Sequence, residues 1–224
     1  MKPKVIIFDL DETLTDRSLA IEEFANRFVS HYFPNCYEDE ARFIKNTCII
    51  ADNGGYRDKQ EVYHMLVVQL NWTTPPGVNE YVSFFREEMP KCIKPKKYLY
   101  ESLSYFLENK VRMGIITNGT VKMQRAKIDV LGIQDYFECI VISEEAGIRK
   151  PEIGIYRIAL EQLRILPSEV WFVGDNPTND IMGAMDFGMK GIWITRADKW
   201  EIEEYKPYAM IRELNELVEL YKAL

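Results

Sequence analysis

The residues that decide the fold are Lys4-Val-Ile-Ile-Phe-Asp-Leu10, near the start of the 224-residue chain. They form a short, continuous apolar run rich in β-branched side chains, which is typical of a strand buried on both faces of a sheet. The run ends at an acidic turn that contains Asp9 and Asp11. A strand of this kind must belong to a larger sheet, whose other strands lie further along the chain.

A helical pattern replaces the strand pattern beyond this turn. Apolar residues recur at helical spacing, as Phe24 and Phe28 illustrate. Two loop signals, Asp52-Asn-Gly-Gly55 and Thr73-Thr-Pro-Pro-Gly77, interrupt the stretch. The pattern predicts four helices and no strand, and therefore an all-helical insertion at residues 16–94.

The remainder of the chain alternates helices with strands. We expect helices at about 98–109, 121–131, 153–163 and 181–187, and strands at about 111–117, 139–142, 170–173 and 191–195. Such alternation implies crossover connections and a parallel sheet. The sequence therefore predicts an α/β fold with a doubly wound, Rossmann-like parallel sheet. The core would be discontinuous, formed by residues 1–15 and 95–224, with the helical insertion as a second domain.

The composition excludes several classes of protein. The 35 acidic and 28 basic residues give a formal net charge of −7, which argues against binding to nucleic-acid polymers or to an anionic membrane. No apolar run approaches the ~18 residues that span a bilayer, and the first residues lack a signal peptide pattern, so we expect a cytoplasmic protein.

The four cysteines lack C-x-x-C spacing and the two histidines are too few for a multi-histidine metal site. We expect buried free thiols.

Polar side chains follow four of the predicted strands, at the point where each strand ends. In open parallel sheets, ligands bind beyond the carboxyl ends of the strands. The residues in question are Asp9, Asp11 and Thr13, then Thr117 and Asn118, then Lys150, and finally Asp175 and Asp180. We expect these four segments to converge on one edge of the sheet.

The acidic and basic residues of this edge predict a metal site and an anion site in one cleft. Asp9 and Asp11 lie two residues apart, so both would point to one face and would need a cation or a shared proton. Together with Asp175 they suit a hard cation such as Mg²⁺. Thr117, the amides after it and Lys150 suit phosphate oxygens. This inventory fits phosphoryl transfer, in which one carboxylate forms an aspartyl-phosphate and its neighbour exchanges protons.

The four segments resemble the ordered motifs of the haloacid dehalogenase-like (HAD) hydrolase superfamily. The matching residues are Asp9-Leu-Asp11-Glu-Thr13, Thr117-Asn118, Lys150-Pro151, and Gly174-Asp175 with Asp180. A helical insertion directly after the first motif resembles the cap of subfamily I. Members that resemble true dehalogenases lack an Asp at the position of Asp11, transport ATPases carry Lys there, and phosphonate hydrolases carry a small residue. The resemblance therefore leaves phosphatases and phosphomutases.

The resemblance also implies a role for each residue. Asp9 would be the nucleophile and Asp11 the general acid and base. The implied phosphate-binding residues are Thr117, Asn118 and Lys150, and the implied Mg²⁺ ligands are Asp9, Asp175 and the Asp11 carbonyl, with Asp180 and Thr13 in support.

The insertion is expected to supply specificity. Its loop Asp52-Asn-Gly-Gly-Tyr-Arg57 contains glycines, and Arg57 or Tyr56 could reach a leaving group when the insertion closes. A solvated loop explains the same residues equally well. Aromatic residues of the insertion could stack on a nucleobase, although such residues at helical spacing are more often core; they are Tyr32, Phe33, Tyr37 and Trp72.

The leading hypothesis is a Mg²⁺-dependent phosphatase that hydrolyses a small phosphate monoester through an aspartyl-phosphate. Similarity to the nucleotidase-like branch of subfamily I suggests a nucleoside monophosphate as the substrate, while sugar phosphates, phosphoglycolate and a phosphomutase reaction stay open.

A receiver-type phospho-acceptor is the alternative from another class. It is opposed by the helical insertion and by the absence of an acidic residue at the strand end occupied by Thr117. A catalytically idle binding protein is opposed by the intact set of acids and bases. The expected partner is a small phosphorylated metabolite, and the protein could be a monomer or a homodimer.

Overall fold

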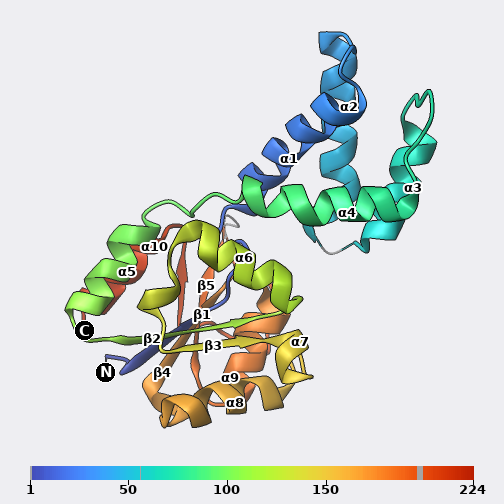
Figure 1. Ribbon diagram of the computed structural model, residues 1–224. Helices are drawn as coiled ribbons and strands as arrows, with labels where there is room; N and C mark the ends of the chain where they lie inside the picture. Colours follow the sequence, from blue (N-terminus) through green and yellow to red (C-terminus); the bar gives the residue numbers. More distant parts are fainter. Residues whose placement is uncertain (1, 56, 196–198) are drawn as a thin grey trace. The chain divides into compact units, whose positions relative to one another are not determined.

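The computed structural model describes residues 2–55, 57–195 and 199–224. The chain divides into two compact units, one formed by Met1–Asp16 with Pro95–Leu224 and the other by Arg17–Lys94. Figure 1 shows a sheet with helices in the first unit and helices alone in the second. We refer to them as the core unit and the helical unit, and each is described by itself.

The core unit contains a six-stranded parallel sheet with the strand order β3-β2-β1-β4-β5-β6. The strands are β1 (Val5–Phe8), β2 (Arg112–Thr117), β3 (Cys139–Ile142), β4 (Val170–Gly174), β5 (Lys190–Ile194) and β6 (Ala209–Ile211). All four residues of β1 are buried, because the strand pairs with β2 on one side and β4 on the other. Its uninterrupted apolar sequence is what a central strand covered on both faces requires. The predicted doubly wound parallel sheet is confirmed.

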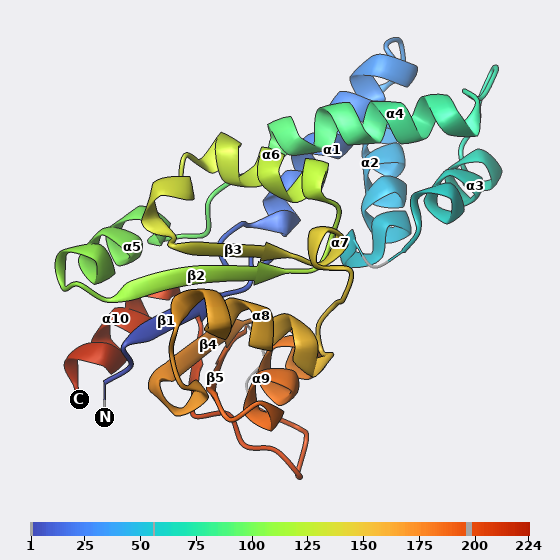
Figure 2. The ribbon, with the colours of Figure 1, turned by 60° about the horizontal axis from the view of Figure 1, so that its bottom comes forward.

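Helices cover both faces of this sheet. They are α5 (Leu99–Glu108), α6 (Val121–Leu131), α7 (Ser143–Ala146), α8 (Ile153–Leu163), α9 (Gly183–Asp186) and α10 (Leu214–Lys222). In Figure 2, α8 and α9 lie on one face and α5 and α6 on the other. Successive strand residues point to opposite faces: the ring of Phe172 lies 5.7 Å from Tyr156 of α8, whereas that of Trp171 lies 6.4 Å from Tyr221 of α10.

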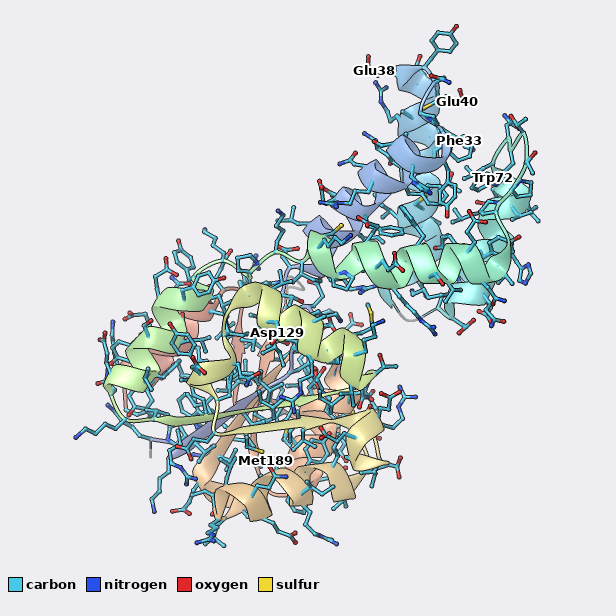
Figure 3. The ribbon with its side chains drawn as sticks, viewed as in Figure 1. Phe33, Glu38, Glu40, Trp72, Asp129 and Met189 are labelled. Carbon is cyan, nitrogen blue, oxygen red and sulfur yellow. The ribbon has the colours of Figure 1, made fainter. Side chains whose placement is uncertain are left out.

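The described residues of the helical unit form four α-helices, as predicted. They are α1 (Arg17–Tyr32), α2 (Glu38–Asp52), α3 (Lys59–Gln69) and α4 (Val78–Glu88). An aromatic cluster holds them together, in which Phe28 contacts Tyr32, Phe33 and Trp72. Figure 3 labels Phe33 and Trp72, whose ring centres are 4.6 Å apart. Tyr32, Phe33 and Trp72 are therefore half-buried and pack around the buried Phe28, while Tyr37 is exposed.

The C-terminal part of the core unit differs from the prediction. Strand β6 was not predicted, because it is only three residues long. Helix α10 was also missed, although its Leu214 and Leu217 lie at helical spacing. The helix expected at 181–187 begins earlier, as a π-helical segment, Pro177–Met182, that continues into α9. Asn176 caps this segment by accepting hydrogen bonds from two backbone amides, and the following proline favours a helix start.

The cysteines are free thiols, three of them buried and Cys36 half-buried. Burial raises the pKa of Cys48 to about 12, so this thiol stays protonated at neutral pH. Within the described parts of the chain, none of the helices has both the length and the apolar character needed to cross a membrane.

Candidate active site

Asp9 occupies the position directly after β1. Its backbone N–H donates to the carbonyl of Val173 at 2.9 Å, which extends the pairing of β1 with β4 by one residue. The backbone up to Asp9 therefore keeps the strand pairing, and the residue is held at the carboxyl edge of the sheet, where it is only 6% exposed. The two strands place Asp9 and Asp175 at the same edge.

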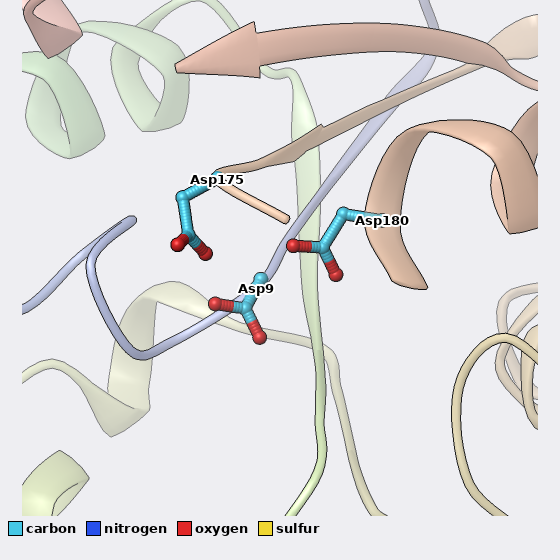
Figure 4. Close-up of side chains that lie close together, drawn as sticks. All are labelled: Asp9, Asp175 and Asp180. Carbon is cyan, nitrogen blue, oxygen red and sulfur yellow. The ribbon is translucent and has the colours of Figure 1, made fainter. Parts of the chain in front are cut away.

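Three carboxylates gather at this edge. Asp9, Asp175 and Asp180 each offer an oxygen, and these oxygens all lie within 4.8 Å of one another (Figure 4). The Nζ atom of Lys150 lies 2.6 Å from Oδ1 of Asp9 and 2.6 Å from Oδ1 of Asp180. Lys150 thus contacts two of the three carboxylates, and the cluster carries more negative than positive charge.

This charge imbalance is visible in the pKa values. Burial is the main reason that the pKa of Asp9 is raised from 3.8 to about 7, with Lys150 opposing the rise. The pKa of Asp175 is raised to about 9, again mainly by burial and then by repulsion from Asp9. Burial alone would lower the pKa of Lys150, but attraction to Asp180 and Asp9 outweighs it and the pKa is raised. Without a further cation, the cluster favours protonated carboxyl groups.

Asp180 is held by the segment that follows β4. The Oδ2 atom of Asp180 accepts a hydrogen bond of 2.9 Å from the backbone N–H of Asn176, and Asp180 itself is 1% exposed. Gly174 makes this approach possible, since a Cβ atom there would overlap the Asp180 side chain. One oxygen of Asp180 is therefore fixed by backbone and the other faces Lys150.

The backbone of Asp175 is anchored by a residue of the neighbouring strand. The indole Nε1 of Trp193 donates to the carbonyl of Asp175 at 2.7 Å. The Trp193 ring in turn packs edge-on against Trp200, with centroids 4.9 Å apart. This contact ties the turn after β4 to β5.

Asn118 positions Lys150 through its side chain. The Oδ1 atom of Asn118 accepts from the backbone N–H of Lys150 at 2.9 Å, and its Nδ2 donates to the Lys150 carbonyl at 3.0 Å. The amide group of Asn118 is thus engaged on both of its polar atoms. This reciprocal pair fixes the loop that carries Lys150 against the end of β2.

Asp11 lies apart from the three-carboxylate cluster and contacts helix α6. Both oxygens of its carboxylate lie 2.7 Å from Nζ of Lys127, and Oδ2 accepts from Nε2 of Gln124 at 3.1 Å. The same Nε2 donates to Oγ1 of Thr117 at 2.6 Å. Gln124 therefore links Asp11, from the first motif, to Thr117, from the second.

Sequence reasoning missed Gln124 and Lys127. A signal for them exists, because they share the buried face of α6 with Ile128 and Leu131 at helical spacing. Polar residues at such positions need partners from elsewhere in the fold. The partner in this case, Asp11, lies more than a hundred residues away in the chain, as its 116-residue separation from Lys127 shows.

The remaining predicted residues lie in different surroundings. Thr13 is fully buried, and its Oγ1 has no hydrogen-bonding partner among the described residues. Arg57 belongs to the helical unit, where its Nη1 donates to the carbonyl of Ala51 at 2.6 Å at the end of α2. Tyr56 lies outside the described residues.

A buried ion cluster in the helical unit was also missed. Asp52 accepts from Nη2 of Arg17 at 2.8 Å and from Nζ of Lys59 at 2.7 Å. Burial alone would raise the pKa of Asp52, but Arg17 and Lys59 outweigh it and the pKa is lowered below 3.8. The cluster ties the start of α1 to the end of α2 and the start of α3.

An acidic cluster beside a buried lysine lies at the carboxyl edge of the parallel sheet, which is the edge where α/β proteins of this type bind their ligands. The chain belongs to the haloacid dehalogenase-like hydrolase family, whose family model matches residues 6–194. It is therefore a hydrolase by family.

Similar proteins with assigned activities cover nearly the whole chain. A pyrimidine 5'-nucleotidase from Escherichia coli is 35% identical over 226 residues, covering 98% of both chains. A glyceraldehyde 3-phosphate phosphatase from Pyrococcus furiosus is 31% identical over 228 residues, covering 97% of this chain and 92% of the relative.

Solved structures share the fold at lower identity. A magnesium-bound HAD hydrolase from Bacillus subtilis is 21% identical, covers 99% of both chains and gives a TM-score of 0.78. The L-2-haloacid dehalogenase from Xanthobacter autotrophicus is 18% identical, covers 99% of both chains and gives a TM-score of 0.73. These two likenesses concern the fold.

Proposed function

We propose that this protein is a Mg²⁺-dependent phosphatase that hydrolyses a small phosphate monoester through an aspartyl-phosphate on Asp9. The observation that carries the proposal is the buried Asp9 carboxylate, which lies among Asp175 and Asp180 and 2.6 Å from Lys150. A nucleophile of this kind needs its charge balanced and its orientation fixed before it can attack phosphorus. The relatives named as phosphatases support the same reaction class.

The residues present fit a divalent cation. Carboxylate oxygens are the ligands that Mg²⁺ prefers. The cluster combines three carboxylates with the one ammonium of Lys150, which leaves two negative charges that such an ion would balance. Asp9 and Asp175 would hold the ion, while Asp180 is already engaged by Lys150 and Asn176. When bound, Mg²⁺ would supply Lewis-acid stabilisation of charge on the phosphoryl oxygens.

The chain's own residues account for both halves of the reaction. A carboxylate oxygen of Asp9 forms a bond to phosphorus while the ester P–O bond breaks, and the leaving oxygen takes a proton from Asp11. Water then attacks phosphorus, gives a proton back to Asp11, and the bond between phosphorus and Asp9 breaks. Asp9 and Asp11 return to their starting states, and the products are an alcohol and inorganic phosphate.

We assign phosphate binding to Thr117, Asn118 and Lys150. The Thr117 hydroxyl accepts from Gln124, so its own proton is free to be donated to a phosphoryl oxygen. Because the Asn118 amide is engaged by Lys150, Asn118 would contact phosphate through its backbone N–H. The Lys150 ammonium would balance the charge that develops on the transferring group.

We propose that the helical unit is the cap that selects the substrate. Arg57 remains a candidate leaving-group contact, but to act so its guanidinium would have to leave the carbonyl of Ala51. Two of the relatives that span the chain act, by name, on a pyrimidine nucleotide and on glyceraldehyde 3-phosphate, a triose phosphate. A nucleoside monophosphate is therefore the first substrate to test, followed by sugar phosphates and phosphoglycolate.

The test is phosphate release by the purified protein with Mg²⁺, first from an aryl phosphate and then from a metabolite panel. We expect turnover by the wild type and a loss of at least 100-fold in D9N. Inactivity on every substrate, or full activity of D9N, would contradict the proposal. An aspartyl-phosphate that persists for minutes without turnover would indicate a receiver, and transfer within a sugar without phosphate release would indicate a mutase.

A further inference from the structure

We propose that Lys127 and Gln124 of α6 are positioning residues, which hold the Asp11 carboxylate and the Thr117 hydroxyl in the orientations that the reaction needs. This inference rests on the proposed phosphatase function and on the role of Asp11 as general acid and base. Neither residue would touch the substrate; each would act through a residue that does.

Lys127 approaches Asp11 from the helix side. Its Nζ lies 2.7 Å from each carboxylate oxygen, which leaves the carboxylate little freedom to rotate. The side chain of Lys127 is 5% exposed, while that of Asp11 is 29% exposed. The lysine is thus shielded from solvent, while part of the Asp11 side chain stays accessible. A lysine side chain is long enough to bring its ammonium from a helix surface into water. The burial of the Lys127 ammonium therefore requires a charged partner, which is Asp11.

Gln124 completes the arrangement and fixes a hydrogen-bonding direction. Its Oε1 accepts from Nζ of Lys127 at 2.8 Å, so its Nε2 must face Asp11 and Thr117. The Thr117 hydroxyl therefore accepts a hydrogen bond from one side and can donate its proton to the other. The connected hydrogen bonds of Lys127 and Gln124 thus orient both the Asp11 carboxylate, which transfers the proton, and the Thr117 hydroxyl, which binds phosphate.

A purely structural ion pair would explain the same distances, so the experiment must separate the two roles. General acid catalysis matters for a leaving group that departs as a basic alkoxide and matters little for an acidic phenol. The value of kcat/KM reports the steps up to departure of the leaving group, that is, formation of the aspartyl-phosphate. Loss of Asp11 positioning should therefore depend on the leaving group, whereas loss of folded protein should not.

The test compares kcat/KM of K127M for an alkyl phosphate and for 2,4-dinitrophenyl phosphate, each relative to the wild type. We expect a loss of about 100-fold with the alkyl phosphate and less than about 5-fold with the dinitrophenyl ester. The variant K127R, which keeps a cation, should recover part of the loss. Asp11 also accepts the proton of the water that hydrolyses the aspartyl-phosphate, so this second step should be slow in K127M. With the dinitrophenyl ester we therefore expect a burst of dinitrophenol followed by slow turnover.

Two further variants make the result independent of folding defects. K122M places the same substitution on an exposed lysine of α6 and should match the wild type with both substrates. K127Q removes the charge but keeps a polar side chain, so it repeats the measurement if K127M is unstable. Equal losses with both substrates, or no loss with either, in K127M and K127Q would overturn the inference. A wild type that hydrolyses neither ester would instead refute the proposed function.

Discussion

The ammonium of Lys150 lies 2.6 Å from a carboxylate oxygen of Asp9, and both residues are almost fully buried. A pair of this kind restrains the carboxylate and also lowers its capacity to repel an incoming phosphate dianion. The ammonium of Lys150 makes a second contact of 2.6 Å, with a carboxylate oxygen of Asp180. Lys150 is thus the cation on which the arrangement of the cluster depends.

Replacing Lys150 should therefore impair both catalysis and folding. In K150M we expect kcat for an aryl phosphate to fall by about 10²–10³-fold, because a fixed positive charge is lost beside the phosphoryl group. Unpaired buried carboxylates should also lower the free energy of unfolding by about 3–5 kcal/mol without Mg²⁺. Denaturant titrations with and without Mg²⁺ measure this loss, which the ion should partly restore. K150M with wild-type kcat would contradict the assignment.

Stability without metal should fall as the pH rises. The pKa values of Asp9 and Asp175 are raised to about 7 and about 9, so the folded state binds protons more tightly than the unfolded chain. The stabilising effect of these protons is complete below pH 4 and is lost as the pH passes through 7 and 9. Mg²⁺ would replace the protons, so the increase in Tm on adding it should be larger at pH 8.5 than at pH 5.5. Equal increases at both pH values would show that these carboxylates do not bind the ion.

The approach of Asp180 to Gly174 should make this glycine intolerant of substitution. In G174A the new Cβ would overlap the Asp180 side chain, so we expect a loss of about 1–3 kcal/mol in stability and a lower kcat. Gly77 offers a matched control, because a Cβ there would meet no atom within 4 Å. G77A should retain wild-type kcat in the same assay. A fully active G174A would mean that the position of Asp180 is not critical.

The ion cluster of the helical unit should contribute to stability at neutral pH. Removing the charge in D52N leaves Arg17 and Lys59 without their buried partner, and we expect a loss of about 3–5 kcal/mol, measured by hydrogen exchange within α1 and α2. Because the pKa of Asp52 is lowered, the difference in the free energy of unfolding between the wild type and D52N should be present above pH 4 and disappear as the pH falls below it.

Asp39 provides the control, because it is an exposed residue of α2 that lies 3.6 Å from Arg42. D39N should change the free energy of unfolding by less than about 0.5 kcal/mol. Similar exchange rates in the D52N variant and the wild type would refute this role.

The sequence alone determined the architecture of the core sheet. Strand β1 reads as an unbroken apolar run because it is covered on both faces, and the helices α6 and α8 follow the expected periodicity at their predicted positions. The polar residues at the strand ends share one edge because parallel strands all point the same way, so topology alone brings Asp9 and Asp175 together. These features arise from local patterns and from chain connectivity.

Only the tertiary structure decided which charged groups are partners. Asp11 lies only two residues after Asp9, yet its carboxylate contacts Lys127 and lies apart from the acidic cluster. Asp180 belongs to the cluster, and it lies in a π-helical segment that apolar periodicity does not predict. The Asn118 amide is likewise engaged by the Lys150 backbone. Each choice depends on a side-chain rotamer and on a partner far away in the chain. Helical spacing indicates that Lys127 is buried, but it indicates neither the rotamer nor the partner, because the packing of the folded core brings the two groups within hydrogen-bonding distance.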